Sequence, residues 1–127
     1  MKNNIYQIFG VVANARLKEI EKNSSKIKAF NSIKKVFKLP FDSDFFGSIN
    51  RTDISLKKAK NLLLVEQQKV NHALFWFINA KPIDKIAIEN IKNGDIDKAT
   101  EIWKSQVEKS EINIKNYSYY SNLSTIL

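Results

Sequence analysis

The stretch RLKEIEKNSSKIKAFNSIKKVFK, residues 16–38, decides the fold class of this chain. Its apolar and small side chains recur at steps of three and four residues, and they are Leu17, Ile20, Ser24, Ile27, Phe30, Ile33 and Phe37. Such steps place side chains on one stripe of an α-helix, whereas a strand would show a period of two. The stretch therefore predicts a long amphipathic helix, with Asn14 as the residue that caps its N-terminus.

The opposite side of this predicted helix is basic. Residues 1–60 carry 13 Lys and Arg against 5 Asp and Glu, whereas residues 61–127 carry 8 of each, so the first half holds the whole formal net charge of +8. A basic face of this kind predicts either an acidic partner or only a well-solvated surface. The candidate partner-binding residues are Lys18, Lys22, Lys26, Lys28, Lys34 and Lys35.

Glycine and proline divide the rest of the chain into further helices. A short helix at residues 5–9 ends at Gly10, and a loop at residues 39–52 follows the basic helix. Three phenylalanines in this loop predict that it packs back on the core. A second long helical region then begins at Thr52 or Asp53 and contains a break at residues 64–66. It ends in the apolar segment 74–77, which we expect to be buried on several sides.

Three more helices are expected beyond residue 80. Pro82 suits the first turn of a helix that Asn93 and Gly94 stop. Asp95 then caps a helix that reaches Val107, and a last helix covers residues 117–127. No segment of the chain shows sustained period-two alternation. The sequence predicts an all-α fold with one unit at 1–80 and a second at 81–127, packed together.

The composition argues against most catalytic chemistry. The chain has no cysteine and one histidine, His72, which lies in a predicted helix and is expected to be structural. Asp42 and Asp44 form only a D-x-D pair, which is a weak cation signal without the glycine and glutamate of a calcium loop. We therefore expect no catalytic residue, no cofactor and no metal, and we do not expect an enzyme. No apolar run is long enough to span a membrane and the start does not resemble a signal peptide, so the prediction is a cytoplasmic protein.

Two consecutive motifs near the start suggest a family. Residues 4–11, NIYQIFGV, are similar to the motif N-x-Y-x-x-L-G-V, and residues 13–20, ANARLKEI, are similar to N-A-[ST]-x-x-E-I. Both belong to the J domain, the module with which co-chaperones engage the heat-shock ATPase, so residues 3–78 resemble a J domain. The resemblance implies that Gly10 closes the first helix and that the basic helix meets the acidic ATPase. It also implies that the helix around Leu56 and Leu63 completes an antiparallel hairpin.

The chain departs from this family at its catalytic tripeptide. A functional J domain carries His-Pro-Asp at the end of its second helix, and that tripeptide drives stimulation of ATP hydrolysis. The aligned position here holds Ser32, Ile33 and Lys34, and no His-Pro-Asp occurs in the loop. The resemblance therefore implies binding without stimulation of the ATPase.

The C-terminal third contains a second pattern. Residues 94–103, GDIDKATEIW, resemble the second-helix signature G-x-Y-x-x-A-x-x-x-[FYW] of a tetratricopeptide repeat. Leu123 lies 37 residues after Ile86, where a standard repeat would place it about 34 residues on. The chain would then be a fragment of a longer repeat protein, or one that covers its end by self-association. The alternative is an ordinary helical hairpin unrelated to repeats.

Three functional classes follow from these observations. The first is a non-catalytic J-like co-chaperone or adaptor that binds a protein, with a heat-shock chaperone ATPase as the candidate partner. The second is a nucleic-acid-binding protein that uses Arg16–Lys38, although no aromatic residues are interleaved with the basic face for stacking. The third is a self-associating scaffold that uses the aromatic residues at 75–77 and 117–120.

Overall fold

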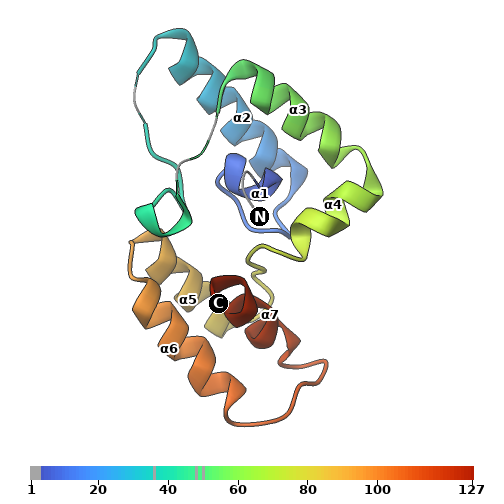
Figure 1. Ribbon diagram of the computed structural model, residues 1–127, viewed down its shortest axis with the longest axis vertical. Coiled ribbons are helices and arrows are strands. Elements are labelled where there is room, and N and C mark those ends of the chain that lie inside the picture. Colours follow the sequence, from blue (N-terminus) through green and yellow to red (C-terminus); the bar gives the residue numbers. More distant parts are fainter. Residues whose placement is uncertain (1–3, 36, 48, 50) are drawn as a thin grey trace.

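The computed structural model describes residues 4–35, 37–47, 49 and 51–127. Within these residues the chain is all helical and has no strand, so the predicted fold class is confirmed. The elements are α1 (Ile5–Ile8), α2 (Leu17–Ser32), a 3-10 turn η1 (Asp44–Phe46), α3 (Asp53–Leu63), α4 (Glu66–Ala73), α5 (Pro82–Lys92), α6 (Ile96–Val107) and α7 (Tyr117–Ile126). Figure 1 shows α1–α4 grouped in one lobe and α5–α7 in another.

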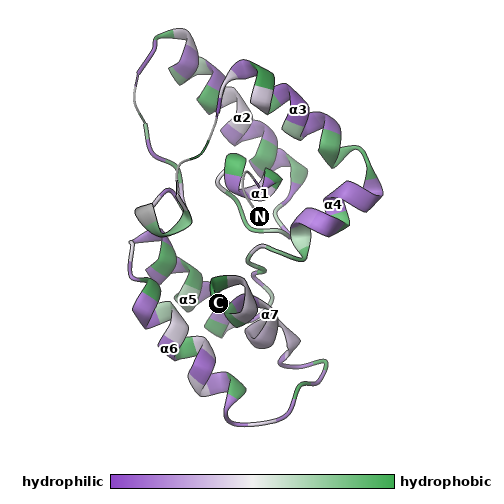
Figure 2. Ribbon diagram, viewed as in Figure 1, coloured by the Kyte–Doolittle hydropathy of each residue, from purple (hydrophilic) through white to green (hydrophobic). Residues whose placement is uncertain are grey.

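The first lobe is built around the short helix α1. Helices α2 and α3 run in opposite directions, and α1 packs against α3 and α4 (Figure 1). All four residues of α1 are buried. Ile20 and Ile27 of α2 and Leu56 of α3 complete this core. Figure 2 shows hydrophilic and hydrophobic residues alternating along α2 and α3, as expected of helices with one face turned to a core.

The ends of α1 are held by specific hydrogen bonds. The Asn4 side chain accepts a bond from the Tyr6 N–H at 3.0 Å and donates one to the His72 carbonyl at 2.8 Å. At the other end, the Gly10 N–H donates to Gln7 and the Val11 N–H to Tyr6. This pair of bonds, with a φ of +66° at Gly10, is a Schellman motif, in which glycine is favoured because it has no Cβ.

A buried carboxylate organises the second lobe. Asp84 in the first turn of α5 accepts hydrogen bonds from Trp103 of α6 and Asn122 of α7. Asn122 also pairs with the backbone of Ile78, where it accepts from the N–H at 2.7 Å and donates to the carbonyl at 2.8 Å. The three helices and the segment before α5 are therefore joined at one point.

Aromatic rings lie between the two lobes. Phe41 from the loop after α2 stacks on Phe77, with ring centroids 5.7 Å apart, and Phe77 stacks on Trp103 at 5.8 Å. Trp76 meets the edge of Phe41 at 5.3 Å. Phe41 has a φ of +72°, which is an unfavourable conformation for a bulky side chain and is held here by its buried contacts.

Several predicted boundaries are confirmed. Thr52 caps α3 by accepting from the Ser55 N–H, and Asp95 caps α6 by accepting from the Lys98 N–H. Pro82 is the first residue of α5, and Gly94, with a φ of +85°, follows its end. The predicted break at residues 64–66 separates α3 from α4.

The prediction for Asn14 was wrong. Asn14 does not cap α2, which begins after Arg16. Its side chain instead donates to the Asn79 carbonyl at 2.8 Å and accepts from the Asn79 N–H at 3.0 Å. The amide is thus used to join two distant segments of the chain.

Two predictions about apolar side chains were wrong in part. Within the segment 74–77, Trp76 and Phe77 are buried, but Leu74 and Phe75 are exposed because α4 has already ended at Ala73. In the loop, Phe41 is buried and Phe46 packs against the core, whereas Phe45 is exposed.

Candidate partner-binding site

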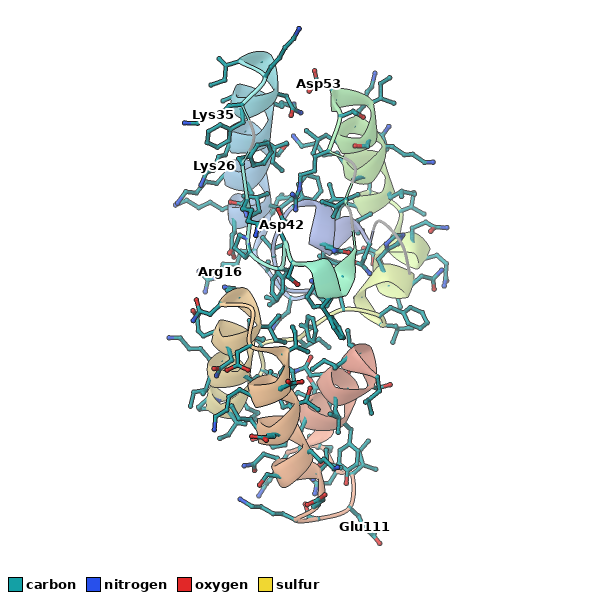
Figure 3. All side chains as sticks on the ribbon, turned by 60° about the vertical axis from the view of Figure 1, so that its left-hand side comes forward. Arg16, Lys26, Lys35, Asp42, Asp53 and Glu111 are labelled. Atoms are coloured by element: carbon teal, nitrogen blue, oxygen red, sulfur yellow. The ribbon has the colours of Figure 1, made fainter. Side chains whose placement is uncertain are left out.

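Three of the six candidate lysines form one surface on α2. Lys18, Lys22 and Lys26 are spaced by four residues and all are exposed. Ile20, Ser24 and Ile27 on the opposite side of the helix are buried. We call Lys18, Lys22 and Lys26 the lysine stripe. In Figure 3 Lys26 points away from the rest of the molecule.

The lysine stripe has no acidic partner within the part of the chain that the structure describes. None of its three ammonium groups takes part in an ion pair there. Like charges four residues apart on a helix destabilise it by roughly 0.2–0.5 kcal/mol per pair. An acidic surface placed against the stripe would relieve this repulsion.

Lys28 lies on a different side of α2. Together with Lys57 and Lys60 of α3 it lines a groove between the two helices. Ten residues separate it from Lys18, which is a rotation of about 280° on an α-helix. The structure therefore divides the predicted basic face into two surfaces.

Lys34 and Lys35 lie beyond the end of α2. The predicted helix through residue 37 was wrong, because α2 ends at Ser32 and Lys34 adopts a φ of +53°. The Lys34 N–H donates to Asn31 and the Lys35 N–H to Phe30, which closes the helix with a Schellman motif. A lysine in the left-handed position is uncommon, so the residue types around Lys34 do not predict that the helix ends here.

The aromatic residues near these lysines are already packed. Phe30 stacks on Phe37 with ring centroids 4.8 Å apart. The Nζ of Lys35 lies 5.8 Å from the centroid of the Phe30 ring, within range of a cation–π interaction. Because the stack occupies one face of each ring, this pair offers less surface for stacking on nucleic-acid bases.

His72 has a structural position, as its sequence context predicted. It is buried, and its Nδ1 accepts a hydrogen bond from the Ile5 N–H at 3.1 Å. Burial lowers the pKa of the His72 imidazole below its ordinary value. The neutral ring that this favours is the form that can accept the bond.

Asp42 binds an arginine within its own loop. Its carboxylate forms a two-pronged ion pair with Arg51, with Nη1–Oδ2 at 2.6 Å and Nη2–Oδ1 at 2.7 Å. Arg51 also donates from Nε to the Ile8 carbonyl at 2.7 Å and from Nη2 to Gln7 at 3.1 Å. The cation that Asp42 holds is therefore this guanidinium, which caps the C-terminal carbonyls of α1. The side chain of Asp44 lies outside the described residues.

The residues that the structure describes contain no group of three His, Asp or Glu side chains that could hold a metal ion. Across the same residues, no helix is long and apolar enough to cross a bilayer.

No protein-family model, curated protein or solved structure matches this chain.

Proposed function

We propose that this protein is a non-catalytic adaptor of the cytoplasm that binds an acidic surface of a protein partner through the lysine stripe. The observation that carries the proposal is the stripe itself, with three exposed ammonium groups on one face of α2, none of which forms an ion pair with a described residue. Opposite charges at a protein interface raise the rate of encounter and fix the orientation of the partner.

The arrangement of the first lobe supports a J-like version of this adaptor. A short helix, a basic helix, a loop and an antiparallel helix follow in the J-domain order. Asn4 caps α1 and Gly10 closes it, so both motif residues have structural roles. The position that aligns with His-Pro-Asp, residues 32–34, lies at the C-terminal end of α2. A heat-shock chaperone ATPase is accordingly the partner that we propose, bound without stimulation of ATP hydrolysis.

The second lobe is compatible with a tetratricopeptide-like hairpin. Gly94 makes the turn between α5 and α6, and Ala99 is fully buried where these helices pack. An alanine at such a position lets two helices approach closely. We propose that this hairpin supports the first lobe.

The test is a charge reversal with a matched control. The variant K18E/K22E/K26E changes three exposed lysines of the stripe, and the control K85E/K98E/K104E makes the same change at exposed lysines of α5 and α6. Binding to a purified heat-shock ATPase is measured by titration, and ATP turnover is measured in parallel. We expect the stripe variant to bind at least about tenfold more weakly, a loss of about 1.4 kcal/mol, and the control to bind normally. Equal binding by all three proteins, or stimulated ATP turnover, would contradict the J-like proposal.

Nucleic-acid binding by Arg16–Lys38 is the competing outcome. It predicts capture of nucleic acid from an extract, loss of that capture after nuclease treatment, and an affinity that falls steeply with salt. Capture of a protein partner that persists after nuclease treatment, at both low and moderate salt, supports the adaptor instead.

A further inference from the structure

A groove between α2 and α3 is distinct from the lysine stripe. It consists of two adjoining cavities of about 560 and 500 Å³, and both are lined by Lys60 and Asn61. One cavity lies toward the end of the helix pair that contains Lys28 and Asp53, and the other toward the end that contains Leu17.

The first cavity is basic. Lys28 from α2 and Lys57 and Lys60 from α3 line it, against the single carboxylate of Asp53. None of these three lysines forms an ion pair with a described residue. Asp53 accepts a long hydrogen bond of 3.4 Å from the Asn31 side chain. The positive charge of this cavity is therefore largely uncompensated.

The second cavity is largely apolar. Ile20 and Tyr6 are buried beneath it, whereas Leu17 and Leu64 at its edge are 65% and 84% exposed. Exposed leucines around one hollow, Leu17 at the start of α2 and Leu64 just after the end of α3, are unfavourable in water, and such recessed apolar surface often marks a binding site. Glu21 and Lys69 complete the rim with opposite charges.

The spacing of the two cavities indicates which shape of ligand would fit the groove. Lys57 and Leu64 are seven residues apart, which corresponds to about 10 Å, or about two helical turns. An amphipathic helix lying along the groove would therefore bring carboxylates to the lysines and an apolar side chain to the leucines, two turns apart.

We infer that this groove binds an amphipathic acidic helix from a protein partner. The charge of the basic cavity selects the carboxylates, and the leucine-edged cavity takes an apolar anchor, which is the usual mode of helix-in-groove recognition. A second copy of this chain is a poor occupant because its net charge of +8 opposes self-association. A small anion would use only the basic cavity. This inference does not depend on the lysine stripe.

The experiment uses defined peptides and the full chain. The probe is a fluorescently labelled peptide of about four helical turns, with leucines on one face of one half and glutamates on the same face of the other. It is made in both orders, leucines first and glutamates first. A scrambled peptide and a peptide with glutamine in place of glutamate are the controls. Binding is followed by fluorescence anisotropy, and chemical-shift changes in the labelled protein locate the site.

We expect one order of the peptide to bind saturably and to shift residues of α2 and α3 that face the groove. Two groove variants, L17S/L64S and K57E/K60E, should each weaken binding by at least about tenfold. All four positions are exposed or only half-buried, and unchanged fluorescence of the buried tryptophans reports that the fold is retained. The stripe variant K18E/K22E/K26E should bind the peptide within about twofold of the parent.

Three outcomes would overturn the inference. They are the absence of saturable binding by either order, equal binding of the scrambled peptide, and loss of binding in the stripe variant but not in the groove variants. Binding to vesicles of anionic lipid that L17S/L64S and K57E/K60E abolish, with no binding of the peptides, would assign the groove to a membrane surface instead. A further result is that the groove test fails while the complex with the ATPase still depends on the lysine stripe. That result would overturn this inference and leave the proposed function standing.

Discussion

The carboxylate of Asp84 accepts a hydrogen bond from the indole Nε1 of Trp103 at 2.9 Å, and both side chains are fully buried. The same Oδ1 accepts from Asn122 at 3.1 Å. Oδ2 accepts from the backbone N–H groups of Ala80 and Lys81 at 3.2 and 3.0 Å. A carboxylate removed from water is tolerated only where donors of this kind replace the lost hydration. Asp84 therefore links α5, α6, α7 and the segment before α5 through the four donors that surround its carboxylate.

We expect Asp84→Asn to destabilise the protein by about 1–3 kcal/mol. Asparagine keeps one acceptor oxygen but turns an NH₂ group toward donors, so at least one of them is left without a partner. The measurement is the free energy of unfolding in urea, followed by tryptophan fluorescence, because both tryptophans are buried.

Asp95→Asn is the matched control for this substitution. Asp95 caps α6 at an exposed position, and asparagine caps a helix about as well as aspartate. We expect a change within about 0.5 kcal/mol. Equal losses in the two variants would show that Asp84 acts only as another carboxylate that caps the start of a helix.

The helix boundaries that the sequence predicted correctly have local causes. Thr52, Pro82, Gly94 and Asp95 each act on the turn in which they lie, so their residue type carries the information. Asp84 lies in the first turn of α5, a common position for an acidic residue, and no local feature of the sequence marks it as buried. Its partners Trp103 and Asn122 are 19 and 38 residues away, and no periodicity connects them.

The candidate site was likewise predictable only where its geometry is set within one helix. The four-residue spacing of Lys18, Lys22 and Lys26 is sufficient to place them on one stripe. Lys28 and the lysines of α3 line the same groove only through the packing of two helices, which the spacing within either one does not reveal. Lys34 was misplaced because a lysine in the left-handed conformation ends α2 earlier than the apolar pattern suggested.

Arg51→Lys tests the contact between the loop and α1. Lysine keeps the positive charge but lacks the planar group that binds the Asp42 carboxylate with two bonds and also reaches the Ile8 carbonyl. Since both side chains of the pair are largely buried, we expect a loss of about 2–4 kcal/mol. The readout is the midpoint of urea unfolding. The control is Arg16→Lys at an exposed position, where we expect almost no change. A similar loss at both arginines would contradict the special role of Arg51.

Alanine substitutions at two glycines distinguish the stability lost to an unfavourable backbone conformation from the stability lost to steric crowding. Gly10 and Gly94 both have a positive φ, so alanine at either costs roughly 1–2 kcal/mol through its conformation alone. A Cβ at Gly10 would lie 2.9 Å from the Cβ of Leu39, whereas a Cβ at Gly94 meets no heavy atom of a described residue within 4 Å. We expect Gly10→Ala to lose at least about 1 kcal/mol more than Gly94→Ala in thermal or urea unfolding. Equal losses of stability in the two variants would mean that the turn at Leu39 shifts to accommodate the new Cβ without loss of stability.

The stability of the first lobe should depend on pH through His72. The folded protein favours the neutral imidazole, because burial lowers its pKa and its Nδ1 accepts the bond from Ile5. The unfolded chain therefore takes up a proton first as the pH falls. The stability that this side chain contributes is complete above the unfolded pKa, near 6.5, and is lost as the pH falls from there through the lower folded pKa.

The variant His72→Asn isolates this effect, because the chain has no other histidine. Asparagine can offer an acceptor oxygen to the Ile5 N–H but does not titrate in this range. Between about pH 7.5 and about pH 5.5 we expect the free energy of unfolding to fall in the parent and to stay nearly level in the variant. Equal slopes in the two proteins would mean that carboxylates alone govern this range. The difference in slope measures directly how strongly the hydrogen bond between α4 and α1 requires a neutral ring.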